Sequence, residues 1–281
     1  MSDSGDLAFE LPSVKAAEKQ RAAEVLAALE KAYPDAHCEL THANPYELLV
    51  ATILSAQSTD AGVNKVTPEL FKRFPSPAAY VASTPEVIET YINRIGLFRN
   101  KARAIHAAMR DIVEKFGGQV PRTMEELLTL RGVARKTANV VLGNAYRINV
   151  GFVVDTHIER VSKRFGLVDH GASVAMTERR LMALFPRNHW CDASHVLIFH
   201  GRYSCKARGV NCNMNSICDA YGTACECRPG KVANKRVARK PVAKVTTKPI
   251  ARAAKGKNLD GACRNERPTE PAIAARPPMT A

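Results

Sequence analysis

The sequence predicts an all-α protein, and three observations support this prediction. A short polar residue precedes proline at four places, and because such a residue caps a helix while proline suits its first turn, each pair predicts a helix start. Apolar residues recur at spacings of three and four, the period of a helix face. No stretch alternates apolar and polar residues between hairpin turns, so strands have no support. The predicted starts are Asn44-Pro45, Thr67-Pro68, Ser76-Pro77 and Thr84-Pro85.

The longest apolar faces delimit two helices in chain order. The first face comprises Val25, Leu26, Leu29 and Tyr33, and Pro34 follows it directly. Because proline cannot continue a helix, this helix is expected to end there. The second face comprises Ile105, Met109, Ile112 and Val113, and Gly117 follows it.

Smaller signals complete the helical pattern. Glu47 stands three residues after Asn44, and Glu126 stands three residues after Thr123, the spacing of a reciprocal helix cap. Gly96 follows another periodic run and predicts a further helix end. We therefore expect about ten helices.

Charge is concentrated at the end of the 281-residue chain, whose formal net charge is +14. From Arg228 onward fourteen Lys and Arg stand against three acids, so residues 228–281 carry +11 and the rest +3. A basic tail favours a polyanion partner, although it could simply maintain solubility. The tail also contains few large apolar residues, which predicts a disordered arm.

Two function classes are disfavoured by composition. No apolar run approaches the roughly 18 residues of a membrane span, and the first ten residues are acidic, so neither a membrane protein nor a signal or transit peptide is expected. The eight cysteines do not suggest a secreted scaffold either, because five of them crowd into one short stretch, a pattern that favours a metal or cluster site. These five are Cys205, Cys212, Cys218, Cys225 and Cys227.

The segment 130–141 predicts a tight turn between two helices. A helix that begins after a turn of small residues leaves backbone N–H groups unpaired, and the positive end of its dipole adds to their attraction for an anion. Such a helix start binds phosphate.

This segment closely resembles the helix-hairpin-helix motif of the endonuclease III family, whose pattern is Leu-Pro-Gly-Val-Gly-Arg-Lys-Thr-Ala. Arg131 stands in place of the proline and Ala134 in place of the second glycine. If Ala134 adopts a positive φ, we expect a strain of about 1 kcal/mol. The resemblance extends over nearly all of residues 20–227, with landmarks at 54–60, 95–97, 154–157 and 200–203.

The resemblance implies a covalent reaction. Lys136 would attack C1′ of a damaged nucleotide, displace the base and form a Schiff base, for which its amine must be neutral. We expect Arg135, the helix end and partial burial to favour the neutral form. The alternative is a lysine that only binds phosphate. Asp155 is expected both to cap a helix and to transfer protons, the alternative being a cap alone, whereas His157 is expected to be structural.

The resemblance also implies how DNA is held. Because chemistry at C1′ requires the nucleotide to leave the stack, Gln57 and Leu97 are expected to fill the gap, although both could be ordinary surface residues. The hairpin residues expected to contact DNA are Gly132, Val133, Ala134, Arg135 and Thr137.

The family binds a [4Fe-4S] cluster through a C-x6-C-x2-C-x5-C loop. The chain keeps the first spacing, from Cys205 to Cys212, but Asn215 stands where the third cysteine is expected. The resemblance then implies Cys205, Cys212, Cys218 and Cys225 as ligands, with Cys227 as an alternative fourth. A zinc ion or an empty loop remains an alternative.

The resemblance implies a two-lobed all-α fold. Residues 38–149 would form a six-helix barrel with the hairpin, residues 1–37 and 150–227 a second helical domain, and residues 228–281 a tail. The implied enzyme is a monomeric bacterial cytoplasmic DNA glycosylase and abasic-site lyase that acts on oxidised pyrimidines in double-stranded DNA. The alternatives are a non-catalytic hairpin module, an electron carrier and a monofunctional adenine-mispair glycosylase, the last disfavoured by Lys136.

Overall fold

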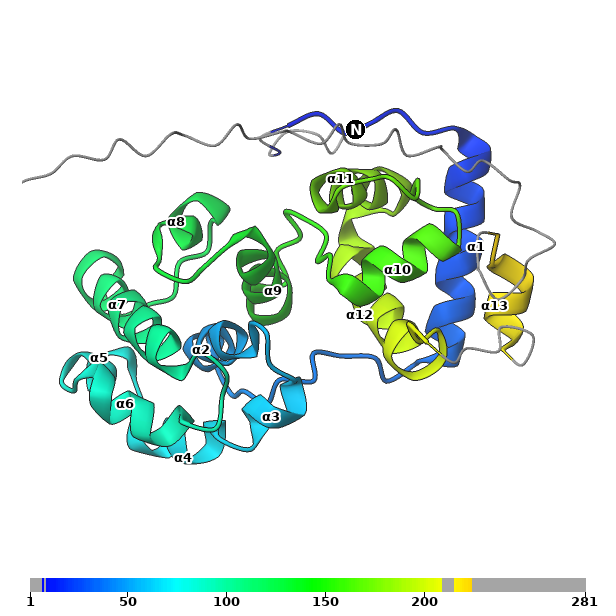
Figure 1. Cartoon of the computed structure of the whole chain (residues 1–281). Coiled ribbons are helices and arrows are strands. Elements are labelled where there is room, and N and C mark those ends of the chain that lie inside the picture. Colours follow the sequence, from blue (N-terminus) through cyan, green and yellow to red (C-terminus); the bar gives the residue numbers. More distant parts are fainter. Residues whose placement is uncertain (1–6, 8, 209–214, 224–281) are drawn as a thin grey trace, which may run out of the picture. The chain divides into compact units, whose positions relative to one another are not determined.

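The computed structural model describes Leu7 and residues 9–208 and 215–223, all within one compact unit, Met1–Asn234. The predicted all-α class is confirmed, because the described residues form helices and no strand (Figure 1). The tail and its expected disorder lie outside the described residues. The α-helices are α1 Ala16–Ala32, α2 Pro45–Ser55, α3 Asp60–Asn64, α4 Thr67–Arg73, α5 Pro77–Val81, α6 Pro85–Ile92, α7 Phe98–Phe116, α8 Met124–Thr129, α9 Arg135–Tyr146, α10 Thr156–Arg164, α11 Val174–Leu184, α12 Trp190–Phe199 and α13 Ser216–Tyr221.

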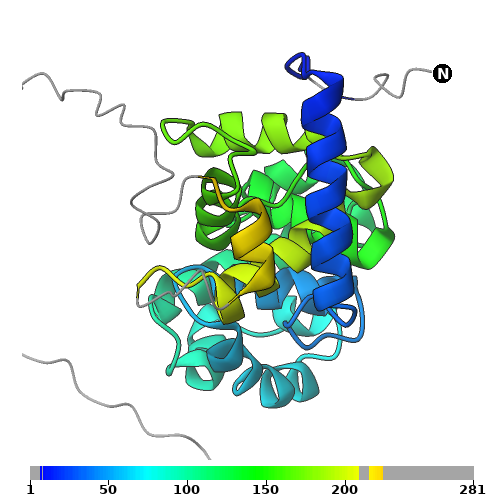
Figure 2. The same cartoon turned by 90° about the vertical axis from the view of Figure 1, so that its right-hand side faces the viewer.

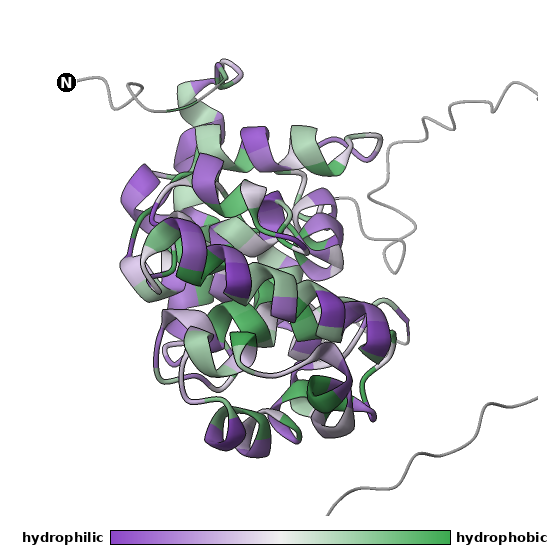
Figure 3. Ribbon diagram, turned by 90° about the vertical axis from the view of Figure 1, so that its left-hand side faces the viewer, coloured by the Kyte–Doolittle hydropathy of each residue, from purple (hydrophilic) through white to green (hydrophobic). Residues whose placement is uncertain are grey.

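Helices α2 to α9 enclose one hydrophobic core. Its buried members range in sequence from Leu40 to Leu142, and among them Phe74 stacks on Tyr80 with ring centroids 4.5 Å apart. Helix α7 packs against both α5 and α6. Hydrophobic and hydrophilic residues alternate along these helices, as expected of helices with one buried face (Figure 3).

Helices α1 and α10 to α13 enclose a second core, whose buried members come from residues 22–29 and 152–218. Helix α1 contacts α11, α12 and α13, so the beginning of the chain packs beside its later helices (Figures 1 and 2). The two cores agree in sequence with two lobes. The domain boundaries given above stay a prediction.

Most of the predicted helix starts lie where the polar residue and proline indicate. The side chains of Asn44 and Ser76 cap α2 and α5, and Thr84 is the N-cap residue of α6 without a side-chain bond. Thr67 differs: it is the first residue of α4, whose N-cap is Val66. At the other end of a helix, Gly117 ends α7 at φ +59°.

Among the described residues, no helix is long and apolar enough to cross a membrane.

Candidate active site

The hairpin between α8 and α9 has the backbone that a tight turn requires. Gly132 has φ +84°, and a Cβ there would lie 3.0 Å from the Cβ of Ala104, so glycine is required both by conformation and by space. The expected strain at Ala134 does not arise, because this residue has φ −102° as the N-cap of α9. An extended backbone suits alanine, which explains why this departure from the family pattern is tolerated.

Lys136 is the second residue of α9 and is exposed rather than partly buried. Its neighbour Arg135 turns away from it: the guanidinium Nε lies 3.0 Å from both carboxylate oxygens of Glu178, and the guanidinium carbon lies 5.0 Å from the ring centre of Phe9. These contacts join the start of α9 to α11 and to the N-terminal segment. Arg135 therefore helps to fix the helix that carries Lys136.

Asp155 is the N-cap of α10, as the sequence predicts. Its Oδ1 accepts hydrogen bonds from the backbone N–H groups of His157 and Ile158, at 2.9 and 2.8 Å. Both capping bonds use the same oxygen, so the cap does not require Oδ2. One carboxylate can therefore cap the helix and present an oxygen to a substrate.

A cavity of about 910 Å³ brings Lys136 and Asp155 together. Lys136 approaches from α9 of the first helix group and Asp155 from the start of α10 in the second. The other lining residues are His37, Glu39, Ser55, Ser58, Thr59, Asp60, Ala61, Asn64, Val154, Thr156, His157, Glu159, Val174, Arg202 and Tyr203. The two residues chosen from the sequence thus line one open site.

Asp60 and Arg202 are charged residues of this cavity to which sequence analysis gave no role. Arg202 Nη2 lies 2.6 Å from Asp60 Oδ2, and the Arg202 guanidinium also pairs with Glu39. Burial raises the pKa of Asp60, while the positive charge of Lys136 lowers it. Both residues lie within the quoted landmarks, but sequence separation hides their contact.

Gln57 and Leu97 lie in two loops that meet. Both have a left-handed backbone, with φ +54° and φ +59°, and both are exposed, Leu97 by 57%. The buried amine of Lys101 joins the loops from α7, because it donates to the carbonyl of Leu54 at 2.8 Å and to Ser58 Oγ at 3.0 Å. An exposed leucine held in a strained conformation is a costly feature for a surface residue without a role.

A smaller cavity of about 80 Å³ extends from the same site toward His195 on α12. His195 Nε2 lies 2.8 Å from Asn144 Oδ1, and burial lowers the pKa of His195 to about 4. Between pH 6.5 and about 4, this histidine is therefore neutral in the folded protein and protonated in the unfolded chain.

This pKa predicts a pH dependence of stability. Between pH 6.5 and 4 the unfolded state binds a proton that the folded state does not, so the free energy of unfolding falls as the pH falls. Each unit of pKa shift corresponds to about 1.36 kcal/mol, so His195 should lower the free energy of unfolding by up to roughly 3 kcal/mol over this pH range. Urea denaturation of the wild type and of His195→Gln across this range checks it. An equal pH dependence in both proteins would contradict the prediction.

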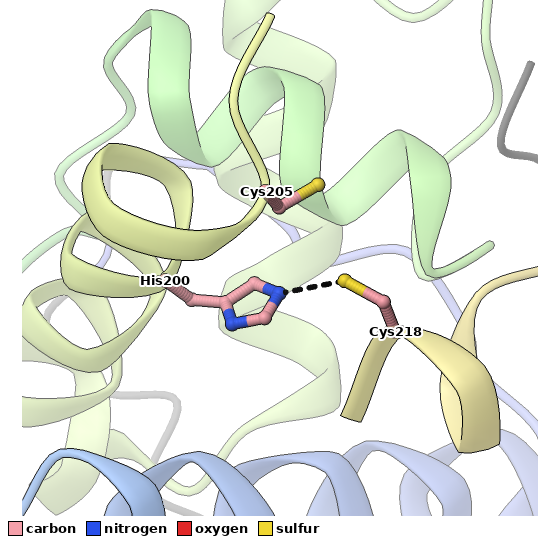
Figure 4. Close-up of side chains that lie close together, drawn as sticks. All are labelled: His200, Cys205 and Cys218. Atoms are coloured by element: carbon pink, nitrogen blue, oxygen red, sulfur yellow. Dashed lines mark hydrogen bonds between the residues drawn. The ribbon is translucent and has the colours of Figure 1, made fainter. Parts of the chain in front are cut away.

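Three potential metal ligands gather in the second core: His200, Cys205 and Cys218 (Figure 4). Their donor atoms all lie within 4.8 Å of one another, and all three residues are buried. Cys212, Cys225 and Cys227 lie outside the described residues. Histidine was not among the ligands expected from the cysteine pattern.

The donor set found among the described residues does not fit a cubane cluster. A [4Fe-4S] cluster takes four thiolates, each on its own iron, so its sulfurs must stand further apart than donors that share one ion. Here the imidazole of His200 lies beside Cys218, its Nε2 3.2 Å from Sγ. Asn215, at the place of the third cysteine, caps α13 by accepting from the N–H groups of Ile217 and Cys218.

Comparison with known proteins shows the family to which the chain belongs. The family described as HhH-GPD superfamily base excision DNA repair protein matches residues 50–187. Endonuclease III of Synechocystis sp. is 52% identical over 70% of this chain and 90% of its own length. Endonuclease III of Bacillus subtilis is 48% identical over 66% and 86%. A solved trapped endonuclease III–DNA covalent intermediate matches with 46% identity and a TM-score of 0.69, covering 72% of this chain and 94% of that one. The chain therefore belongs to the endonuclease III family of helix-hairpin-helix base excision DNA repair proteins.

Proposed function

We propose that this endonuclease III family member is a bifunctional enzyme of base excision repair. It removes oxidised pyrimidines from double-stranded DNA and then cleaves the abasic site by β-elimination. The observation that carries the proposal is the cavity lined by both Lys136 and Asp155. The relatives support the same activity, because a matching solved structure is a covalent endonuclease III–DNA intermediate. A hairpin module without catalysis would need neither residue, and the endonuclease III relatives do not favour an adenine-mispair enzyme.

In the first step the neutral amine of Lys136 attacks C1′ of the damaged nucleotide. An N–C1′ bond forms while the glycosidic bond breaks, and the base leaves with the electron pair and acquires a proton. The bound amine then loses one proton, and the C1′–O4′ bond breaks as O4′ takes up a proton, so the sugar ring opens and a protonated Schiff base remains on Lys136. Removal of a proton from C2′ then expels the 3′ phosphate, so the strand is cut.

Asp155 supplies a fixed negative charge and a proton acceptor in the same cavity. Positive charge develops at the sugar as the glycosidic bond breaks, and a carboxylate oriented in advance stabilises it. The same group can accept a proton from the attacking amine. Its orientation is set by the two capping bonds to Oδ1, which leave Oδ2 available for the reaction.

The hairpin is proposed to hold a phosphate of the DNA. The side chain of Ala134 makes no capping bond, so the first N–H groups of α9 remain available to an anion. Gly132, Val133, Ala134 and Thr137 form this turn and the first turn of the helix. Arg135 stays a predicted DNA contact, although its guanidinium is bound to Glu178.

Gln57 and Leu97 are proposed to enter the duplex where the nucleotide leaves it. Their two loops meet, and the carbonyl of Gln57 lies 4.0 Å from the position of a Cβ on Gly96. Lys101 fixes the loops to each other, so an amide and an apolar side chain enter together. This arrangement can pair with the orphaned base and fill the vacated space.

Replacing Leu97 by glycine separates this role from stability. Glycine adopts φ +59° without strain, so the free energy of unfolding should stay within about 1 kcal/mol of the wild type. We expect the single-turnover rate of base excision from duplex DNA to fall by about 10-fold or more, because roughly 1 to 3 kcal/mol of apolar contact is lost. Rapid-quench kinetics and urea denaturation measure the two effects. An unchanged rate would leave Leu97 a surface residue.

The relatives imply a metal cofactor, and the described chain offers His200, Cys205 and Cys218 for one. The [4Fe-4S] cluster expected from the resemblance remains a prediction, two of whose ligands, Cys212 and Cys225, lie outside the described residues. The reaction is carried by Lys136 and Asp155, and none of the three described donors lines their cavity. Monomeric state, cytoplasmic location and the tail's contact with DNA also remain predictions.

Borohydride trapping tests the proposed function. The full chain is incubated with duplexes that carry an abasic site, a thymine glycol or an A·G mispair, with and without borohydride. We expect strand cleavage and a covalent adduct with the first two duplexes, because a Schiff base is reducible. Base release from the mispair alone, without an adduct, would contradict the proposal.

A further inference from the structure

The ends of three segments bring His200, Cys205 and Cys218 together in the second core. His200 follows α12 and begins a π-turn, His200–Ser204, which Cys205 follows, and Cys218 belongs to α13. The exposed fractions of the three residues are 0%, 1% and 2%. Figure 4 shows the imidazole of His200 and the thiol of Cys218 directed toward each other, with Cys205 nearby. A buried group of this composition is unusual unless its polar atoms are bound.

We propose that His200, Cys205 and Cys218 bind a single zinc ion in place of the iron–sulfur cluster of the family. Zinc is bound by sulfur at about 2.3 Å and by imidazole nitrogen at about 2.0 to 2.1 Å in a tetrahedron, which puts its donors roughly 3.5 to 3.8 Å apart. The three donor atoms here lie within 4.8 Å of one another, and His200 Nε2 is 3.2 Å from Cys218 Sγ. Small side-chain movements bring all three onto one ion.

The hydrogen bonds of His200 prepare its imidazole for this role. Nδ1 lies 3.1 Å from the hydroxyl of Tyr33, and that hydroxyl lies 2.6 Å from Ser204 Oγ. With the Nδ1 proton donated to Tyr33, the lone pair of Nε2 points toward the two cysteines. Metal-binding histidines are held in this manner by a partner on the other ring nitrogen.

Charge balance also favours a zinc ion. Two thiolates and a neutral imidazole give a complex of zero net charge, which can be buried among apolar residues at little cost. Cys205 and Cys218 are themselves members of the second hydrophobic core. Arg164 Nη1, 3.1 Å from Cys205 Sγ, is the nearby cation that stabilises a thiolate.

Sulfur and imidazole donors in a small tetrahedral space select zinc over harder cations, which prefer oxygen ligands. The ion would attach α13 to the rest of the second core. Helix α13 is otherwise held at its end, where Arg21 donates to the carbonyl of Tyr221 at 2.7 Å and Thr223 N–H donates to the carbonyl of Arg164 at 2.9 Å. The metal therefore has a structural role that needs no electron transfer.

Metal analysis of the full chain tests the proposal. The protein is purified without oxygen after expression with iron and zinc both supplied, and its metals are measured by mass spectrometry together with its visible spectrum. We expect about one zinc per chain and no broad absorption near 400 nm, which an iron–sulfur centre would give. About four irons per chain, or protein without metal, would overturn the proposal.

A matched pair of variants tests the histidine. His200→Gln should lower the zinc content by at least about 10-fold, because metal affinity depends on every ligand. His195→Gln changes a histidine on the neighbouring helix α12 that is outside the group, and it should retain zinc. Unchanged zinc in His200→Gln overturns the proposal.

If His200→Gln does not fold, X-ray absorption at the zinc edge of the wild-type protein determines whether an imidazole is among the zinc ligands. An imidazole nitrogen at about 2.0 to 2.1 Å beside sulfur at about 2.3 Å supports the site. Coordination by sulfur alone would overturn it.

Discussion

Replacing Lys136 by glutamine is expected to abolish the covalent adduct with DNA and to lower the single-turnover rate by roughly 10⁴-fold or more, as expected when a nucleophile is lost. Glutamine keeps the length of the side chain but has no amine to attack C1′. Because Lys136 is exposed on α9, the fold should not change. Binding of a duplex with an abasic site, measured by fluorescence anisotropy, should therefore remain within several-fold of the wild type.

A matched variant controls for charge. Lys72→Gln removes the same charge from an exposed position of α4, outside the cavity, and should keep the full rate. A normal adduct in Lys136→Gln would assign the nucleophile to another amine. A loss of DNA binding in parallel with the rate would instead make Lys136 a phosphate-binding residue.

Asp155→Asn is expected to lower the single-turnover rate on the order of 100-fold or more while the fold is retained. Asparagine caps a helix as well as aspartate does, so the bonds from His157 and Ile158 persist and only the charge is removed. Asp155→Ala should in addition lose about 1 kcal/mol of unfolding free energy, because the cap is lost. Single-turnover kinetics and urea denaturation on both variants separate the two roles.

Ser76 provides the control for capping alone. Its side chain caps α5, and Ser76→Ala should lose about 1 kcal/mol of stability with no loss of rate. A near-normal rate in Asp155→Asn would leave Asp155 as only a cap.

Local signals in the sequence are sufficient to predict most of the helix starts and the position of the hairpin. Asn44 and Ser76 cap helices where predicted, because a cap depends on residues three positions apart. Thr67 is the first residue of α4 and not its N-cap residue as predicted, since Val66 takes the N-cap position without a side-chain bond. Ala134 was expected to risk strain because the family has glycine there, but its backbone is extended.

Contacts between distant segments could not be predicted in the same way. The partners of Arg135, Phe9 and Glu178, come from distant parts of the sequence. The pairing of Asp60 with Arg202 joins the start of α3 to the turn after α12.

The proposed metal ligands show the same limit. The cysteine pattern indicated a metal site, yet the contact of His200 with Cys218 depends on how α13 packs against the second core. No spacing rule for cysteines contains that information.

Locating the reduced adduct within the chain tests the central claim most directly. The full chain is trapped by borohydride on a duplex with an abasic site, digested with nuclease and protease, and sequenced by tandem mass spectrometry. We predict that the sugar remnant is attached to Nζ of Lys136, because Lys136 lines the same cavity as Asp155. Attachment to another lysine or to the N-terminal amine, with Lys136 unmodified, would contradict the account.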